Sequence, residues 1–212
     1  YIRDLFDDYA ETFDADLLDS LNYVVPDLIK SALETHLVSD KTSGMHRFER
    51  VLDLGCGTGL VAKAVRPLAH HITGVDLSTK MLEIAMSENR IDKAVNLDMV
   101  DFLKSNEKNE KKFDLIVCGD AIVYLGALEE FINGVTHKLA AKGLFCFTLE
   151  DLVNGNFTLR PSGRYAHHEK YVTNLLRRAN QTLLCSDHIT PRSDSDRKIP
   201  GRLYISRHQD QG

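Results

Sequence analysis

The chain of 212 residues is 43% hydrophobic, contains four cysteines and no tryptophan, and carries a formal net charge of −5. This length and apolar content suit one compact domain, and we treat residues 1–212 as a single domain. No apolar run approaches the roughly 18 residues that a membrane span requires, so we expect no membrane partner. The chain begins at Tyr1 without an initiator methionine, and we interpret it as part of a longer protein.

The charge is unevenly distributed. Residues 160–212 hold ten Lys/Arg and five Asp/Glu, whereas seven acids lie within the first twenty residues. An acidic chain without a basic stripe and interleaved aromatic residues is not typical of nucleic-acid binding. The basic C-terminal third leaves room for a small anionic substrate or a partner, although an unevenly charged solvated surface is the simpler explanation.

The cysteines and histidines do not form a metal-binding pattern. No CxxC pair occurs, and the histidine pairs at 70–71 and 167–168 have no Cys or His partner at ligand spacing, so we expect no metal. Most of the cysteines lie in apolar runs, which predicts buried thiols in a reducing, cytoplasmic setting. The cysteines are Cys56, Cys118, Cys146 and Cys185.

In chain order, the N-terminal part is predicted to be helical. Apolar residues recur every three or four positions up to Leu37, and Pro26 suits the first position of a second helix. Short apolar runs then alternate with amphipathic segments, and two further strand candidates follow near the C-terminus. The predicted strands are residues 51–55, 71–76, 94–98, 113–120, 143–150, 181–190 and 202–208.

Alternating strands and helices predict an α/β domain with a parallel sheet covered on both faces. The runs FDLIVCGD and GLFCFTLE are almost entirely apolar, as expected of central strands buried on both sides. We therefore divide the domain into a helical cap over residues 1–47, a binding core over 48–150, and C-terminal substrate-side strands and loops over 151–212.

A glycine-rich turn in VLDLGCGTGL, Val51 to Leu60, predicts a nucleotide site. Gly55, Gly57 and Gly59 follow a strand and open a helix, where glycine permits a tight turn and close backbone approach to a ligand. Asp76, in GVDLS, ends the next predicted strand, and an acid at that place can hold both hydroxyls of a ribose. Asp98 ends the third predicted strand and is placed to meet an adenine amino group.

These features fit an adenosyl group better than a dinucleotide. The turn reads GxGxG, with Leu60 where the dinucleotide fingerprint has its last glycine. The chain contains no Tyr-x-x-x-Lys pair for hydride transfer and no phosphate-binding GxxxxGK[ST] loop. A nicotinamide-dependent reductase is therefore the less favoured alternative.

The motifs carry a family resemblance. VLDLGCGTGL, GVDLS, the Asp98 position and FDLIVCGDAIVYL resemble motifs I, post-I, III and IV of class I S-adenosylmethionine-dependent methyltransferases, over roughly residues 48–150. FDDYAETFD, CGDAIVYLGALEEF and LRPSGRYAHHEKYV more closely resemble a bacterial subgroup that is often fused behind tetratricopeptide repeats. The resemblance implies a Rossmann-like, doubly wound, mostly parallel sheet of seven strands, with helices on both faces and an antiparallel last strand.

The resemblance also implies the roles of individual residues toward S-adenosylmethionine, whose product is S-adenosylhomocysteine. The glycine turn and Asp53 line the methionine half, Asp76 holds the ribose, and Asp98 meets the adenine, although Asp101 is an alternative for that contact. The full implied set is Tyr9, Phe13, Asp53, Gly55, Gly57, Gly59, Asp76, Leu77, Asp98, the Met99 backbone N–H and the Cys118 carbonyl.

The acceptor and the catalytic groups are less defined by the sequence. We expect a small-molecule acceptor, and we hypothesise that Arg164 orients an acidic group on it. The candidates for a general base are His167, Tyr124, Asp120 and Glu150, and an acceptor that is a carboxylate or a free amine needs none.

Structural roles are equally consistent with several of these residues. Asp120 can cap a helix, Tyr124 can pack in the core, and Ser162, Arg164, Tyr165 and His167 can pack within loops. The alternative function is a non-catalytic adenosyl-binding sensor or partner domain, which only a turnover measurement distinguishes from an enzyme.

Overall fold

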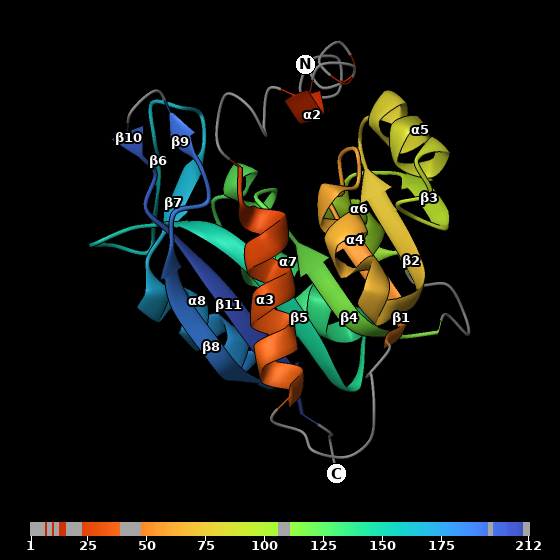
Figure 1. Cartoon of the computed structure of the whole chain (residues 1–212). Coiled ribbons are helices and arrows are strands. Elements are labelled where there is room, and N and C mark those ends of the chain that lie inside the picture. Colours follow the sequence, from red (N-terminus) through yellow and green to blue (C-terminus); the bar gives the residue numbers. More distant parts are fainter. Residues whose placement is uncertain are drawn as a thin grey trace.

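The computed structural model describes residues 7, 10, 13–15, 23–38, 48–105, 111–194 and 197–209 of the chain. A central sheet is flanked by helices on both faces (Figure 1). The described helices are α2 (Phe13–Ala15), α3 (Val25–Val38), α4 (Leu60–Val65), η2 (Arg66–Leu68), α5 (Thr79–Ser87), α6 (Met99–Lys104), η3 (Ile122–Tyr124), α7 (Glu129–Lys138) and α8 (Glu169–Arg178).

The sheet follows the order β3-β2-β1-β4-β5-β11-β8. Its first five strands are parallel, and β11 runs antiparallel to both of its neighbours. Two short strands, β6 and β7, extend it beside β5. The strands are β1 (Phe48–Leu54), β2 (Ala69–Asp76), β3 (Lys93–Asn96), β4 (Phe113–Cys118), β5 (Leu139–Asp151), β6 (Phe157–Leu159), β7 (Tyr165–His167), β8 (Gln181–Ile189), β9 (Ser193–Asp194), β10 (Arg197–Lys198) and β11 (Gly201–His208).

The predicted architecture is confirmed. Seven strands form the path of the main sheet, and the last strand of the chain is the antiparallel one. Helix α3 begins one residue before Pro26, close to the predicted start. The predicted third strand is wrong at its end, because β3 stops at Asn96 and leaves Asp98 outside the strand.

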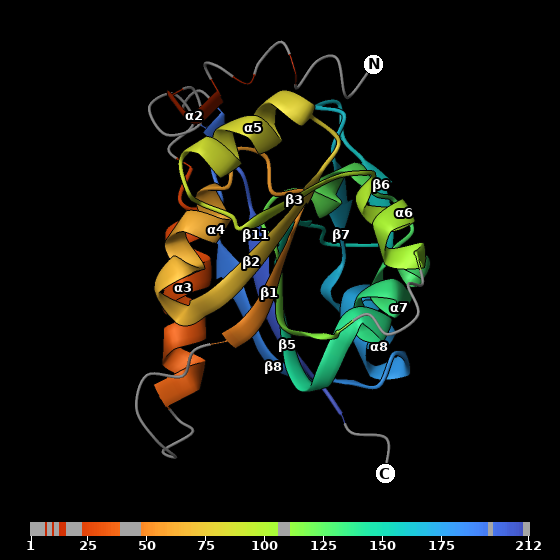
Figure 2. The ribbon, with the colours of Figure 1, turned by 90° about the vertical axis from the view of Figure 1, so that its right-hand side faces the viewer.

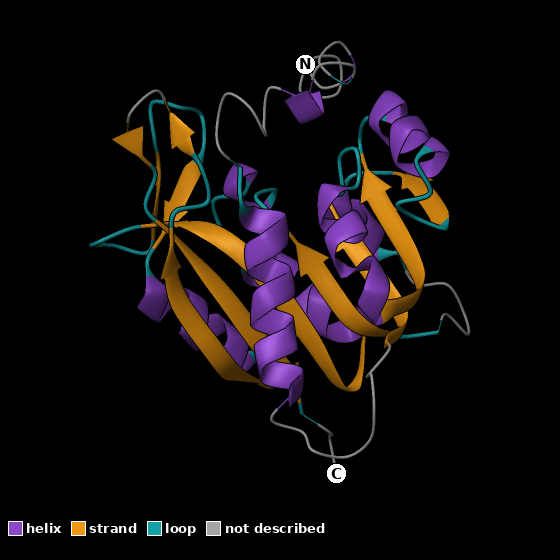
Figure 3. Cartoon of the chain, in the orientation of Figure 1, coloured by secondary structure: helices purple, strands orange, loops and turns teal. Residues whose placement is uncertain are grey.

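Successive side chains of the central strands enter two separate cores, as the period of two in a strand requires. On β5, Leu144 and Cys146 face α3, α4 and α5, whereas Phe145 and Phe147 face α6, α7 and α8. The two helix layers lie on opposite sides of the sheet in Figure 2, and Figure 3 shows the strands running between them. This two-sided burial explains why the strands read as continuous apolar runs in the sequence.

Helix α8 was not predicted from the sequence. Tyr171, Val172, Leu175 and Leu176 are buried at the spacing of one helix face. The His168 side chain caps the helix by accepting a hydrogen bond from the Lys170 N–H (3.1 Å). Four of its ten residues are charged, which makes this apolar face hard to recognise in the sequence.

An aromatic stack crosses the second core. The Phe147 ring, which is fully buried, lies 4.3 Å from the Phe145 ring centroid and 4.9 Å from that of Tyr204, nearly parallel to both. The stack joins β5 to β11, so it ties the antiparallel strand to the parallel part of the sheet.

We predict that Phe147→Ala lowers the free energy of unfolding by about 3–5 kcal/mol, because it removes a large buried ring and leaves a cavity. The unfolding midpoint should fall by more than about 6 °C in calorimetry. Leu159→Ala on β6 is the control, since Leu159 is 56% exposed. Equal midpoints for the two variants would contradict the packing described here.

Candidate functional site

A cavity of about 370 Å³ opens at the carboxyl ends of the parallel strands, beside the point where the strand order reverses between β1 and β4. The arrowheads of β2 and β4 point toward the end of the molecule where α2 lies (Figure 1). The cavity is lined by Phe13, Tyr23, Asp53, Gly55, Cys56, Gly57, Thr58, Leu60, Val61, Val75, Asp76, Leu77, Met81, Leu97, Asp98, Met99, Gly119, Asp120, Ala121, Tyr124, Leu125 and Arg164.

The glycine turn between β1 and α4 forms the floor of this cavity. Gly55 has a φ of 64°, and a Cβ atom there would come within 2.4 Å of the Ala121 Cβ, so the turn requires glycine at this position. Gly57 donates its N–H to Asp76 Oδ2 (2.8 Å), which ties the turn to the end of β2. The loops after β1, β2 and β4 therefore meet around one space.

Asp76 lies at the end of β2 and lines the cavity. Its Oδ1 accepts the Ser78 N–H (2.9 Å), and burial raises the pKa of its carboxyl despite this bond and the one from Gly57. Ser78 caps α5 by accepting the Met81 N–H, so Asp76 is not the helix cap. Each oxygen of a carboxylate has a second lone pair, which leaves acceptor capacity toward the cavity.

Asp98 lines the cavity from the loop after β3, next to Asp76: the Leu97 N–H donates to the Asp76 carbonyl (3.1 Å). Asp98 Oδ1 caps α6 by accepting the N–H groups of Val100 (2.8 Å) and Asp101 (3.2 Å). Asp101 is exposed and does not line the cavity, whereas Leu97, Asp98 and Met99 do. Of the two acids that the sequence left open, Asp98 is the one next to the ligand space.

Asp53 is the most unusual acid of the site. It is 1% exposed, and Oδ2 accepts the Ala62 N–H (3.1 Å), while Oδ1 has no hydrogen-bond partner. Burial raises the pKa of this carboxyl to about 8, with Asp76 adding to the effect. A buried acceptor without a partner is costly, so the position favours a ligand that brings a donor or a positive charge.

Comparison with known proteins agrees with this geometry. Residues 52–145 match a family described as "Methyltransferase domain". The chain is 27% identical over 100 residues to the ubiquinone biosynthesis O-methyltransferase of Rickettsia bellii, covering 44% of this chain and 39% of that one. It is 29% identical over 102 residues to malonyl-acyl-carrier protein O-methyltransferase of Enterobacter lignolyticus, covering 48% and 39%. The matches span less than half the length of these curated relatives.

A solved structure covers more of the chain. The 1,6-didemethyltoxoflavin-N1-methyltransferase of Burkholderia thailandensis, solved with its substrate and S-adenosylhomocysteine, superposes with a TM-score of 0.71 at 18% identity. The superposition covers 99% of this chain and 88% of that one. Residues 52–145 thus match a methyltransferase-domain family, and the fold is that of the class I methyltransferases. The resemblance stated from the four motifs is confirmed over this part of the chain.

A further group of cavity-lining residues follows β4. Asp120 has a φ of 57°, and its N–H donates to Thr148 Oγ1 (3.0 Å). Arg192 donates to both Asp120 carboxylate oxygens (2.7 and 2.5 Å) and also binds Glu150. The cap of the short helix η3 is Ala121, so Asp120 is held by the arginine and does not cap a helix.

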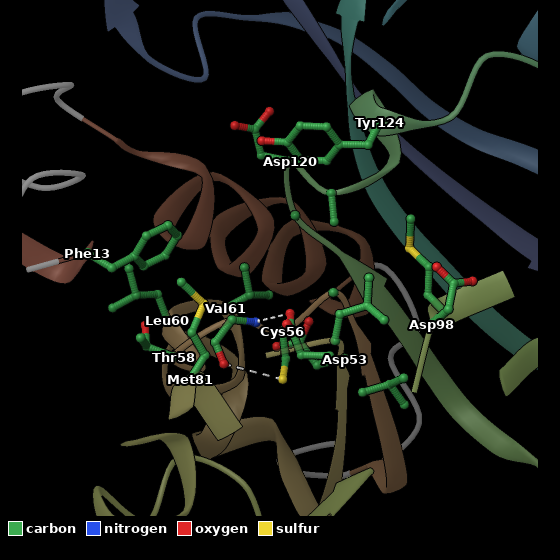
Figure 4. A pocket seen from close by; sticks show the side chains of 18 of the residues that line it. Phe13, Asp53, Cys56, Thr58, Leu60, Val61, Met81, Asp98, Asp120 and Tyr124 are labelled. Carbon is green, nitrogen blue, oxygen red and sulfur yellow. Dashed lines mark hydrogen bonds between the residues drawn. The ribbon is translucent and has the colours of Figure 1, made fainter. Parts of the chain in front are cut away.

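Figure 4 shows Asp120 and Tyr124 on the wall opposite Phe13 and Thr58. The Arg164 guanidinium lies 6.0 Å from the centroid of the Tyr124 ring, and both residues line the cavity. Two of the candidate catalytic residues, Asp120 and Tyr124, are therefore brought together at the site.

His167 and Glu150, the other two candidate bases, do not line the cavity. His167 is 1% exposed, donates from Nε2 to the Gly126 carbonyl (2.8 Å) and stacks on Tyr171. Burial lowers the pKa of its imidazole. His167 thus holds the loop behind Tyr124 from outside the cavity.

The remaining predicted cofactor residues take three kinds of position. Phe13, Leu77 and Met99 line the cavity, whereas Gly59 and Cys118 do not. The Cys118 thiol donates to the Leu54 carbonyl (3.0 Å) in the core, next to Gly119, which does line the cavity. Tyr9 lies outside the described residues, so its contact with the cofactor stays a prediction.

The N-terminal segment is fastened over the glycine turn. The Asp14 carboxylate accepts hydrogen bonds from Arg90 Nη1 (2.7 Å) and from the Thr58 hydroxyl, and Arg90 also donates to the Thr58 carbonyl (3.0 Å). A Cβ atom on Gly57 would lie 3.6 Å from the Phe13 ring. These contacts place Phe13 at the cavity edge.

Tyr23, Arg192 and Arg90 were missed by the sequence analysis. Tyr23 lines the cavity from just before α3, and burial raises the pKa of its hydroxyl well above the usual value, with Asp120 and Asp53 adding to the shift. No motif marks these three residues, because each reaches the site from a distant part of the chain.

No group of three or more His, Cys, Asp or Glu side chains in the described part of the chain has the geometry to hold a metal ion. None of the described helices is both long enough and apolar enough to cross a membrane.

We predict that Asp53 makes the ligand-free protein less stable as the pH rises from about 4 to 8. The folded state keeps the Asp53 proton up to about pH 8, whereas the unfolded chain loses it near pH 4. The unfolded state thus binds fewer protons in this window, and the free energy of unfolding falls by up to about 1.4 kcal/mol per pH unit.

Urea unfolding across this pH range checks the prediction. Asp53→Asn should flatten the decline, while Asp27→Asn, at an exposed position of α3, should leave it unchanged. Parallel curves for the wild type and Asp53→Asn would show that the carboxyl is ionised in the folded protein.

Proposed function

We propose that this protein is an enzyme that transfers a methyl group from S-adenosylmethionine to a small-molecule acceptor. The observation that carries the proposal is the cavity at the sheet switch point, where the glycine turn, Asp76 and Asp98 surround one space. A glycine turn alone is compatible with many nucleotides. Two acids on successive loops around it offer acceptors for both the ribose hydroxyls and the amino group of an adenosine.

The residues present fit this cofactor. Asp76 accepts the ribose hydroxyls, Leu77 packs beside the adenine, and Asp98 Oδ2 accepts from the adenine amino group, because its other oxygen caps α6. The Met99 backbone N–H meets the adenine ring. Asp53 Oδ1, buried without a partner, accepts a hydrogen bond on the methionine half.

The protein supplies alignment and exclusion of water. The bound sulfonium is already a strong methyl donor, so catalysis depends on holding the acceptor atom in line with the sulfur–methyl bond, and positioning of this kind lowers a barrier by roughly 7–11 kcal/mol. Phe13 and the Asp14 contacts with Arg90 and Thr58 cover the turn from the solvent side.

The acceptor carries an acidic group that Arg164 orients. Arg164 lines the part of the cavity that the adenosyl group does not occupy in this assignment, and two further arginines of the C-terminal third, Arg160 and Arg192, bind Glu150. Residues 48–150 hold the cofactor, while residues 1–47 and 151–212 shape the acceptor side of one domain.

The subgroup of the family and the cellular compartment are proposed from the same resemblance and from the cysteines. The enzyme belongs to the bacterial subgroup with tetratricopeptide repeats, and in the full-length protein a repeat domain precedes the methyltransferase domain. It acts in the cytoplasm, in keeping with the buried, free thiols of Cys56, Cys118, Cys146 and Cys185.

We predict that S-adenosylhomocysteine raises the unfolding midpoint by about 5–10 °C at a hundred times its Kd, since such occupancy adds roughly 2.7 kcal/mol. NAD and NADP should leave the midpoint unchanged. A shift with NAD and none with S-adenosylhomocysteine would refute the adenosyl assignment. If S-adenosylhomocysteine binds, methyl transfer to any acceptor distinguishes an enzyme from a non-catalytic adenosyl sensor.

We also predict that Asp98→Asn and Asp101→Asn differ. Asparagine caps a helix as well as aspartate does, so both variants should unfold like the wild type. Asp98→Asn turns an acceptor into a donor facing the adenine amino group, and S-adenosylhomocysteine binding should weaken tenfold or more, or about 1.5–3 kcal/mol. Titration calorimetry checks this, and equal affinities for the two variants would assign the adenine contact elsewhere.

A further inference from the structure

The acceptor side of the cavity presents one arginine on a rigid support. Arg164 follows the tight turn of the β6–β7 hairpin, where Gly163 has a φ of 78° and the Arg160 N–H donates to the Arg164 carbonyl (2.8 Å). Strand β7 pairs in turn with the end of β5. A hairpin that is joined to the sheet in this way fixes the backbone of Arg164 at the cavity wall.

The carboxylates near Arg164 are already paired with other arginines. Arg192 binds Asp120 (2.5 Å) and Glu150, and Arg160 Nε lies 3.2 Å from Glu150 Oε2. This region therefore holds three arginines and two carboxylates, and the two carboxylates are bound by Arg160 and Arg192. Among the described residues, no carboxylate lies at ion-pair distance from Arg164. The surplus positive charge at this wall favours an anionic ligand, and a planar guanidinium matches a carboxylate in shape.

The same wall offers no side chain suited to removing a proton. A general base needs a free lone pair within reach and a pKa near the working pH. Burial raises the pKa of the Asp120 carboxyl, whereas Arg192, which donates to both of its oxygens, lowers it. Each oxygen keeps a second lone pair, but the ion pair with Arg192 makes this carboxylate a weaker base. Tyrosine hydroxyls stay protonated near neutral pH, and burial raises the pKa of Tyr23 further. No histidine or lysine is among the described residues that line the cavity.

We propose that the methyl acceptor is a carboxylate that Arg164 holds through one oxygen, and that the product is a methyl ester. This inference rests on the methyltransferase function proposed above. The second carboxylate oxygen bonds to the methyl carbon while the sulfur–methyl bond breaks and its electron pair stays on sulfur. The acceptor loses no proton, so the reaction needs no base.

Other acceptors fit this wall less well. An alcohol must lose a proton as its oxygen is methylated, and the described wall has no group to take it. A protonated amine would enter as a cation beside the Arg164 guanidinium, where like charges repel. Of these three acceptors, only a carboxylate satisfies both constraints.

The first test measures binding to protein saturated with S-adenosylhomocysteine. Thermal unfolding is followed with a panel of small aliphatic and aromatic carboxylates and the neutral amide of each, on the wild type, Arg164→Gln and Arg178→Gln. Arg178 is an exposed residue of α8 and serves as the control. We expect at least one carboxylate to raise the midpoint of the wild type and of Arg178→Gln but not of Arg164→Gln.

The amides should have no effect on any of the three proteins. Amides as effective as the acids, carboxylates that act equally on Arg164→Gln, or no shift from any carboxylate would each overturn the proposal.

The second test examines the product. The panel acids are incubated with S-adenosylmethionine labelled with tritium in its methyl group, and the product is treated with base, which releases methanol from methyl esters but not from methyl ethers or methylamines. We expect base-volatile label that falls at least about tenfold in Arg164→Gln, with S-adenosylhomocysteine affinity within about twofold of the wild type.

The carboxylate acceptor and the methyltransferase function are overturned by different results. Base-stable label would overturn the carboxylate inference and leave the methyltransferase function intact. A wild-type protein that does not bind S-adenosylhomocysteine would instead remove the proposed function itself.

Discussion

A parallel sheet buried on both faces leaves polar side chains room only at the ends of its strands. In this protein the side chains of β1, β4 and β5 enter one of two cores, and the first acid of the site, Asp53, lies one residue before β1 ends. Because parallel strands end at the same edge of the sheet, the parallel arrangement alone brings their terminal polar residues together. The cavity is thus a consequence of how the sheet is buried.

Acids that lie close together repel one another, and this repulsion is relieved differently in two parts of the cavity. We call these parts the proposed cofactor half, with Asp53, Asp76 and Asp98, and the proposed acceptor half, with Asp120, Tyr124 and Arg164. In the cofactor half, backbone N–H groups supply the partners: Gly57 and Ser78 bind Asp76, and Ala62 binds one oxygen of Asp53. In the acceptor half, a buried arginine does so. Removing Arg192 would leave Asp120 buried without its arginine and Glu150 with Arg160, which is far more costly than replacing the whole cluster by apolar residues.

The difference between the two halves has a functional meaning. Asp53 keeps one oxygen unpaired, so the cofactor half retains the capacity to bind a donor. The acceptor half neutralises its acids within the protein and leaves Arg164 over. One cavity thus presents acceptor oxygens at one end and a cation at the other, as an adenosyl donor and an anionic acceptor would require.

The sequence predicted the part of this arrangement that depends on local pattern. Apolar runs of five to eight residues predicted the central strands. The glycine spacing together with Asp76 predicted the turn that lines the cavity, because both signals depend on local sequence pattern. Asp98 was placed correctly beside the cavity even though β3 ends before it. The cofactor half is almost entirely encoded between residues 48 and 105, where sequence neighbours are also neighbours in space.

The acceptor half depends on contacts between distant segments, and there the sequence failed. Arg192 lies 72 residues from Asp120, and nothing in its local pattern distinguishes it from a surface arginine. His167 was a reasonable candidate base by residue type, but β7 turns it inward onto Tyr171. Its Nε2 proton binds the Gly126 carbonyl, so what it contributes is the position of the loop that carries Tyr124. His167, which is conspicuous in the sequence, is therefore structural. Arg192, which holds Asp120 at this wall, is brought there only by the fold.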